Sequence, residues 1–280
     1  MPVSEQVKAM KSDQQPVVVK IGGHDIADVA FLTELALVIR DLPVPVIVVH
    51  GGGTEISELQ ELMGIVPQYE DGVRITDAAS LMVVEMVLCG VVNTRLVRYL
   101  VSAGVDALGM SGVDRRLVQA VRMPHGKRDM GFTGRVQSVR GDVLREMLTQ
   151  SIVPVIAPLS LGIDASVTYN VNADHVAGAV GVAVNAARVV FITNVEGVMA
   201  GGMLQTILDV ERANRLIANG TISGGMIPKV RTALAALDGG VSQAVITNLH
   251  GLQTGGGTVF PREPVISTNS STILNHGERR

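Results

Sequence analysis

The stretch Val46-Ile-Val-Val-His-Gly-Gly-Gly-Thr54 decides the fold of this chain. Its apolar residues predict a buried strand, and His50 and three glycines follow at once. Glycine loses much chain entropy on folding, so this run indicates positive φ or a close approach of another group. Residues 54–63 have helical spacing, with Thr54 as the expected N-cap. A strand, a glycine turn and a helix N-terminus can together bind an anion, although a tight turn without a ligand is the alternative.

A second strand has a similar ending, in Val17-Val-Val-Lys-Ile-Gly-Gly23. Lys20 lies within a β-branched run, where burial of an ammonium group is costly. It is therefore a functional lysine, a lysine on an edge strand, or one whose stem is buried while its ammonium group reaches water. A helix is expected over residues 28–42, between the two glycine-ended strands. The resulting β-α-β-α order predicts an α/β fold with a parallel sheet and helices on both faces.

Composition narrows the possible functions. The 280 residues are 47% hydrophobic and 18% charged, which is typical of a folded globular protein. A net charge of −3 and an aromatic content of 2% argue against a nucleic-acid partner. Charge, Gly or Asn interrupts the longest apolar stretches, so we expect no membrane partner. Cys89 is the only cysteine, which excludes an internal disulfide and a cysteine-based zinc site and suits a cytoplasmic location; we expect no metal held by the protein.

The rest of the chain continues the alternation of strands and helices. Arg74 is expected in a loop, because turn residues surround it, and a long helix is expected over residues 78–102. Residues 117–123 and 134–139 predict two antiparallel strands. Helices are expected over residues 141–150, 175–186, 209–219 and 229–238, and strands over residues 105–110, 152–157, 167–174, 188–193 and 243–247.

Two lobes are expected. The N-terminal lobe would comprise residues 17–160 and the C-terminal lobe residues 161–260. Flexible ends are expected over residues 1–16 and 261–280.

Several well-known nucleotide and catalytic motifs are absent. The chain has no GxxxxGK[ST], no GxGxxG and no HRD or DFG sequence, which excludes a P-loop NTPase and a protein kinase and disfavours a Rossmann oxidoreductase. His-Gly-Gly-Gly also occurs in lipases, but the GxSxG element of those enzymes is missing. The glycine turns together with Lys20 and Lys229 instead indicate a polyphosphate site.

Five short motifs occur in a fixed order. They are Lys20-Ile-Gly-Gly23, His50-Gly-Gly-Gly53, Gly72-Val-Arg-Ile-Thr-Asp77, Asn170-Val-Asn-Ala-Asp174 and Gly225-Met-Ile-Pro-Lys-Val230. Together they resemble the amino acid kinase family, and within it the acetylglutamate kinases. The resemblance covers residues 17–260. It implies a three-layer αβα sandwich with a mainly parallel central sheet. It also implies that the N-terminal lobe, residues 17–160, binds the acyl substrate and makes the dimer contact, and that the C-terminal lobe, residues 161–260, binds the nucleotide.

The resemblance also implies an activity. The chain would transfer a phosphoryl group from ATP to the γ-carboxylate of N-acetyl-L-glutamate, in the second step of arginine synthesis, with Mg²⁺ carried on the ATP. Lys20 and Lys229 would be catalytic, with Asp174 holding both lysines. The substrate would contact Gly52, Gly53, Arg74 and Asn170, and the nucleotide Gly23, Asn194, Val195, Glu196, Gly197, Val198, Met199, Thr221, Ile222 and Ser223.

The chemistry agrees with this reading. A carboxylate with a pKa of ~4.3 is already ionised at neutral pH, so no general base is needed. Alignment and charge neutralisation are what the reaction requires. This explains why no compelling catalytic His or Ser stands out in the sequence.

Alternatives remain at this point. Asn194 stands where acetylglutamate kinases usually carry Asp, and it resembles kinases that act on amino-adipate or glutamate attached to an acidic carrier protein. A nucleotide-sensing protein without catalysis is another alternative, although it would need a broken phosphoryl site. Arginine-inhibited hexameric members carry an extra N-terminal helix, which residues 1–15 do not promise, so we expect a homodimer without strong arginine feedback.

Overall fold

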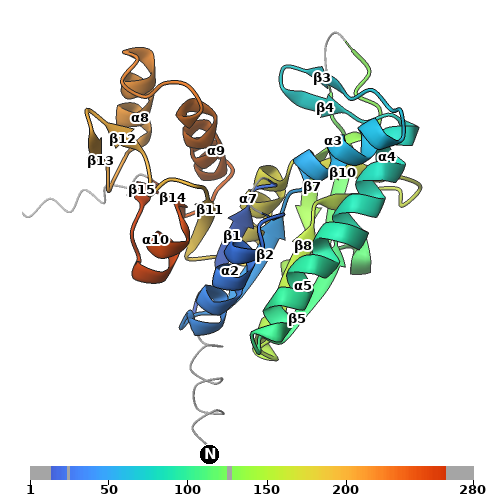
Figure 1. The fold of residues 1–280 in the computed structure, drawn as a ribbon, viewed down its shortest axis with the longest axis horizontal. Helices are drawn as coiled ribbons and strands as arrows, with labels where there is room; N and C mark the ends of the chain where they lie inside the picture. Colours follow the sequence, from blue (N-terminus) through green and yellow to red (C-terminus); the bar gives the residue numbers. More distant parts are fainter. Residues whose placement is uncertain (1–13, 24–25, 125–127, 263–280) are drawn as a thin grey trace, which may run out of the picture.

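The computed structural model describes residues 14–23, 26–124 and 128–262, and within them a seven-stranded sheet organises the fold (Figure 1). The strands lie in the order β15 (Thr258–Pro261), β14 (Gln243–Thr247), β11 (Arg188–Ile192), β1 (Val17–Ile21), β2 (Val46–His50), β8 (Val153–Ala157) and β5 (Ala107–Ser111). All neighbours are parallel except β15, which pairs antiparallel with β14. Because β1 is central, the alternative that Lys20 lies on an edge strand is wrong.

Helices cover both faces of this sheet. One apolar cluster joins alternate residues of the strands to α6 (Gly141–Thr149), α7 (Ala173–Ala183) and α9 (Met226–Asp238). The other joins the remaining strand residues to α2 (Val29–Asp41), α5 (Asn93–Ser102) and α10 (Leu249–Thr254). In β1, for example, Val18 belongs to the first cluster and Val19 to the second, as the two-residue period of a strand requires. The predicted three-layer αβα sandwich is therefore confirmed.

A small closed barrel lies beside the main sheet. It contains β10 (Thr168–Val171), β7 (Thr133–Val139), β6 (Val118–Arg122) and β9 (Leu159–Gly162). The antiparallel pairing of β6 with β7 confirms the predicted pair of strands. The predicted lobe boundary near residue 160 falls inside this barrel, because β10 pairs with both β9 and β7. The strand expected to open the second lobe is thus hydrogen-bonded to strands of the first.

The remaining elements flank the carboxyl edge of the sheet. On one flank are α3 (Gly53–Leu62) and the hairpin of β3 (Gln68–Glu70) and β4 (Val73–Ile75). On the other are β12 (Met199–Ala200), β13 (Met203–Leu204) and α8 (Val210–Ala218). Figure 1 shows β3 and β4 on the opposite side of the central strands from α8 and α9.

The predicted long helix is one continuous element with a change of winding. It runs through α4 (Ala78–Glu85), the π-helical segment η1 (Met86–Val92) and α5. By length and composition alone it could cross a membrane, but its buried residues, such as Val83, Val92 and Leu96, pack in the core. A buried core helix passes the same test, so this finding is weak support for a membrane location.

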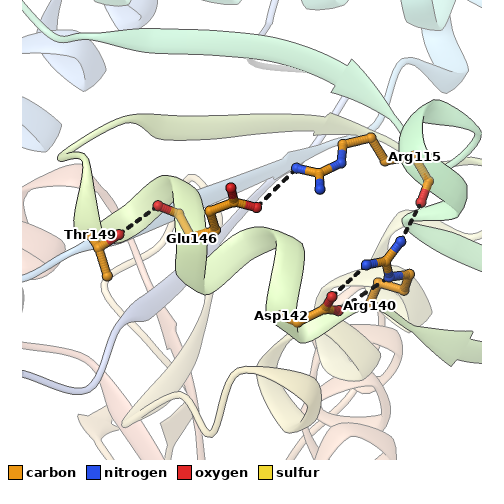
Figure 2. Close-up of polar contacts among 5 residues, drawn as sticks. All are labelled: Arg115, Arg140, Asp142, Glu146 and Thr149. Atoms are coloured by element: carbon orange, nitrogen blue, oxygen red, sulfur yellow. Dashed lines mark hydrogen bonds and ion pairs between the residues drawn. The ribbon is translucent and has the colours of Figure 1, made fainter.

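A polar cluster ties the turn after β5 to α6, as Figure 2 shows. Arg115 belongs to the short 3₁₀ segment η2 (Asp114–Arg116) and pairs with Glu146 at 3.1 Å. Arg140 pairs with Asp142 and donates to the Arg115 carbonyl at 3.4 Å. Arg115 has a φ of 53°, a left-handed conformation that is uncommon for a residue with a side chain. None of these side chains lines the cavities described below, so the cluster connects elements away from the site.

The expected flexible ends, residues 1–16 and 261–280, lie largely outside the described residues. The short parts that are described make ordered contacts. The Pro16 carbonyl accepts from the Ala187 amide at 2.9 Å, and Pro261 belongs to β15.

Candidate active site

Lys20 and the glycine turn lie together at the carboxyl edge of the sheet. The register pairs Lys20 with Val49 and Ile21 with His50, so β1 and β2 end side by side. The Gly51 amide continues this contact by donating to the Ile21 carbonyl at 3.1 Å. In open α/β sheets, ligands bind in the crevice outside the carboxyl ends of the strands.

Two glycines of these turns, Gly23 and Gly52, have little room for a side chain. A Cβ on Gly23 would lie 3.0 Å from the Gly53 nitrogen, and one on Gly52 would lie 2.7 Å from Cδ2 of Leu88. Helix α3 begins at Gly53 with Gly52 as its N-cap. The expectation that Thr54 caps this helix is therefore wrong, because Thr54 already lies within the helix.

Two cavities meet at Lys20. One, of about 530 Å³, reaches Arg74 and is called the Arg74 cavity; the other, of about 630 Å³, reaches Lys229 and is called the Lys229 cavity. Residues that line both are Lys20, Gly23, Gly53, Thr54 and Asp174. This junction is the place where groups bound in the two cavities would come into contact.

An ion pair stands at the junction. The Lys20 ammonium lies 2.7 Å from the Asp174 carboxylate, and the side chains are 17% and 23% exposed. Asp174 is in the first turn of α7, where Asn172 caps the helix by accepting from the Asp174 amide at 2.7 Å. A carboxylate is favoured at that end of a helix dipole. Asp174 therefore has a fixed backbone and a cationic partner.

Lys229 lines the Lys229 cavity together with Lys20 and Asp174. Its helix, α9, begins at Met226, three residues before the predicted start, so Lys229 lies just inside the helix. Asp174 contacts Lys20, and its role in organising the two lysines stays a prediction. Among the described residues no ion pair within 4.0 Å joins Asp174 to Lys229, so the contact with this second lysine stays a prediction.

Arg74 is held by several partners at the wall of the Arg74 cavity. It lies on β4, and the expectation of a loop is wrong because residues 73–75 pair with residues 68–70. Its guanidinium donates to Gln60, to the Ser57 hydroxyl at 2.8 Å and to the Gly53 carbonyl at 3.3 Å. Its carbon Cζ lies 5.0 Å from the centroid of the Tyr69 ring. Partial burial lowers the pKa of Arg74, yet arginine stays protonated at any physiological pH.

Asn170 belongs to β10 and also lines this cavity. Its amide nitrogen donates to the Thr76 hydroxyl at 3.0 Å, and Thr76 in turn contacts the Thr133 hydroxyl at 3.1 Å. Thr133 also donates to the Arg74 carbonyl at 2.7 Å. The two buried threonines thus connect the Asn170 side chain to the backbone of Arg74.

Comparison with known proteins decides the family. The model of the amino acid kinase family matches residues 15–248, which is most of the chain. The chain belongs to the amino acid kinase family.

Relatives of this family are similar over nearly their whole length. The chain is 52% identical to the acetylglutamate kinase of Roseiflexus sp. (strain RS-1), covering 91% of this chain and 98% of that protein. It is 51% identical to the acetylglutamate kinase of Roseiflexus castenholzii, covering 86% and 92%. Among solved structures, smu.665 from Streptococcus mutans UA159 is 28% identical with a TM-score of 0.74, covering 91% of this chain and all of that one.

The residues expected to contact the nucleotide do not all lie at the Lys229 cavity. Gly23 and Asn194 line the Lys229 cavity, but the other candidates in residues 194–199 and 221–223 do not. Val198 is fully buried, and its amide donates to the Thr258 hydroxyl at 2.7 Å. Ile222 is also buried, at 1% exposure. Both side chains belong to the core, so they face away from solvent.

Several residues that support the site were not expected from the sequence. Gln60 is fully buried, accepts from Arg74 and donates to the Ser80 hydroxyl at 2.9 Å. Ser57 and Tyr69 contact the same guanidinium. Helical spacing carries one signal, because Gln60 is three positions after Ser57 and four after the buried Ile56, and such positions are neighbours on a helix surface. The sequence shows nothing that would pair that face with β4.

Proposed function

We propose that this member of the family transfers the γ-phosphoryl group of ATP to the γ-carboxylate of N-acetyl-L-glutamate. One observation carries the proposal: two cavities meet at the Lys20–Asp174 ion pair, with Arg74 in one and Lys229 in the other. The relatives named acetylglutamate kinase, which match over nearly their full length, agree with it. The family makes the chain a phosphotransferase.

The Arg74 cavity suits an acyl amino acid. The Arg74 guanidinium has five N–H donors, of which three are used by Gln60, Ser57 and Gly53, so donors remain for the α-carboxylate. Asn170 lines the same cavity and can hydrogen-bond the acetamido group. The γ-carboxylate would then lie at the junction, near the N-terminus of α3, where the N–H groups of Gly52 and Gly53 can bind an anion.

The Lys229 cavity suits the triphosphate. Lys20 and Lys229 would neutralise the charge that develops as one anion attacks another, which is the main requirement of phosphoryl transfer. Asp174 would hold Lys20 in position by the ion pair already present. The acceptor carboxylate is ionised at neutral pH, so proton removal is not part of the step.

Magnesium fits as a companion of the ATP phosphates. Mg²⁺ usually keeps several waters and binds through one or two carboxylates and the substrate phosphates. In the described part of the chain no group of three or more His, Cys, Asp or Glu side chains gathers to hold a metal. We therefore assign charge neutralisation of the phosphates to Mg²⁺ when it is bound, and substrate alignment to the protein.

Hydroxylamine trapping tests the activity directly. Purified protein with ATP, Mg²⁺ and N-acetylglutamate is expected to form an acyl hydroxamate, because hydroxylamine captures the acyl phosphate. Absence of hydroxamate and of ADP release would overturn the proposal. A product only with glutamate or amino-adipate attached to an acidic carrier protein would select the carrier-linked alternative.

We also propose a homodimer in the cytoplasm. Strand β5 is an edge of the main sheet and exposes Leu108 by 49%, which is unusual for a residue in a sheet edge that stays in water. The adjoining long helix exposes Met82 by 54% and Met86 by 41%. Light scattering should give twice the chain mass of 29.4 kDa. A monomer at micromolar concentration would contradict this arrangement.

A further inference from the structure

His50 is a buried histidine with no part in the chemistry above. Its side chain is 0% exposed, and it is the last residue of β2, directly before the glycine turn. Nε2 lies 3.0 Å from the Asn93 amide nitrogen, and Nδ1 lies 2.9 Å from the Gly51 carbonyl oxygen. Both ring nitrogens therefore have a partner.

The hydrogen bonds fix which nitrogen carries the proton. The Asn93 amide nitrogen also lies 2.9 Å from the Val155 carbonyl, which can only accept, so this atom is the donating NH₂ group. The same NH₂ group must donate to Nε2 of His50, which leaves the proton on Nδ1. Nδ1 then donates to the Gly51 carbonyl. Burial lowers the pKa of His50 to about 4, which keeps this ring neutral.

Asn93 lies where the long helix changes from π-helical to α-helical winding. It is the first residue after the π-helical segment 86–92, and such segments often occur at functional sites. Leu88 and Val92 of that segment lie against Gly52, where a Cβ would come within 2.7 and 3.3 Å of them. Gly109 of β5 makes room for Asn93, since a Cβ there would be 2.1 Å from Oδ1 of Asn93.

We propose that His50 and Asn93 are a positioning pair that fixes the glycine turn 51–53 at the junction of the two cavities. Asn93 orients the imidazole, and the imidazole holds the Gly51 carbonyl, so the N–H groups of the next two glycines keep their direction. Leu88 and Val92 of the π-helical segment lie against Gly52 and so support the turn. This inference rests on the proposed phosphoryl transfer, for which these N–H groups would bind the γ-carboxylate.

The first test separates positioning from stability. Asn93→Leu keeps the size of the side chain and removes both hydrogen bonds. It is expected to lower kcat about 100-fold, because a displacement of about 1 Å costs that much, while KM for ATP changes by less than about 3-fold. The matched control is Leu100→Ala, which opens the core at a buried position two turns along the same helix. A kcat for Asn93→Leu no lower than that of Leu100→Ala, at similar loss of Tm, would overturn the proposal.

The second test replaces His50 by side chains that each keep one of its two hydrogen bonds. The amide of a glutamine reaches the place of Nε2, and that of an asparagine reaches the place of Nδ1. His50→Gln keeps the contact with Asn93 and His50→Asn keeps the contact with Gly51. The pair acts as a unit only if each single contact restores part of kcat, while His50→Leu falls to the level of Asn93→Leu. Equal kcat in all three His50 variants would contradict it. The double variant His50→Leu/Asn93→Leu would also contradict it if its kcat were lowered by the product of the two single effects.

A third measurement does not depend on turnover. In protein labelled with ¹⁵N-histidine, the His50 signal, assigned by its loss in His50→Gln, is expected to show a protonated Nδ1. Asn93→Leu is expected to change this tautomer balance. Protonation at Nε2 in the unaltered protein would overturn the pair. A protein that makes no acyl phosphate but shows the Nδ1–H signal would refute the proposed function alone.

Discussion

The Arg74 cavity and the Lys229 cavity are built in different ways. In the first, Arg74 is fixed by Gln60, Ser57 and Gly53, and Asn170 is fixed through Thr76, so the binding groups are oriented before any ligand arrives. In the second, Lys229 and Asn194 stand on the wall without a comparable network in the described residues. Fixed side chains suit a small acid that must be selected, since a site built to hydrogen-bond one substrate rejects its analogues.

The difference predicts where substitutions act. Groups in the Arg74 cavity should determine which acid binds. Lys229 should instead affect the rate at which the phosphoryl group is transferred between the cavities. Three of the four experiments below test this division and one tests the support of the glycine turn between the cavities; they run from the largest expected effect to the smallest.

Lys229→Ala is expected to lower kcat roughly 1000-fold, because it removes a cation from the transferring phosphoryl group. KM for N-acetylglutamate should change little, since Lys229 does not line the Arg74 cavity. Steady-state kinetics with a coupled ADP assay measures both. An increase in KM with kcat unchanged would mean that Lys229 binds the ground state only.

Because His50 is buried beside the glycine turn, we predict that the free energy of unfolding depends on pH. The pKa of His50 is about 4 when folded and 6.5 when unfolded, so the unfolded chain takes up a proton first as the pH falls. Stability from this group is complete above pH ~6.5, declines between pH ~6.5 and ~4, and the total loss is on the order of 3 kcal/mol. Urea unfolding at pH 7 and pH 4.5 should show a smaller decline in His50→Gln than in the unaltered chain. An equal decline in both proteins would show that other groups cause it.

Much of the fold was predictable because its signals are local. The strand and glycine turn at 46–53 and the strand at 17–22 have the predicted positions within one residue. Parallel strands then bring Lys20 and the turn to one edge, so these residues could be placed together from the sequence. Asp174 differs, because it follows β10, which belongs to the barrel and not to the main sheet, so only the family resemblance predicted its place beside Lys20.

The features that the sequence does not predict depend on contacts between residues that are distant along the chain. The barrel joins β6 and β7 to β9 and β10, and no local pattern specifies that closure. Arg74 was expected in a loop because a three-residue strand is too short to show a period. Val198 and Ile222 were expected at the nucleotide because their stretches resemble the family's, but a stretch does not show which side chains face the core.

Arg74→Lys tests the selectivity of the Arg74 cavity. Lysine keeps the charge but lacks the planar fork that contacts Gln60 and Ser57 while binding a carboxylate. We expect KM for N-acetylglutamate to rise roughly 30-fold, in line with about 2 kcal/mol for a lost charged hydrogen bond, and KM for ATP to stay unchanged. Gln60→Leu is the companion variant, because it leaves Arg74 in place without its buried partner. A rise in KM for ATP equal to that for N-acetylglutamate would show that the two cavities do not divide the substrates.

The smallest effect is expected on the nucleotide side, where Asn194 lines the cavity and Glu196, two residues on, does not. Asn194→Ala should raise KM for ATP by about 5-fold, because it removes a single neutral hydrogen-bonding group worth about 1 kcal/mol. Glu196→Gln, at an exposed position, should change it by less than about 2-fold. Initial rates at varied ATP and saturating N-acetylglutamate separate the two variants. A larger effect from Glu196 than from Asn194 would mean that the loop 194–199 closes over the nucleotide when it binds, and the Lys229 cavity would then be a site completed by its ligand.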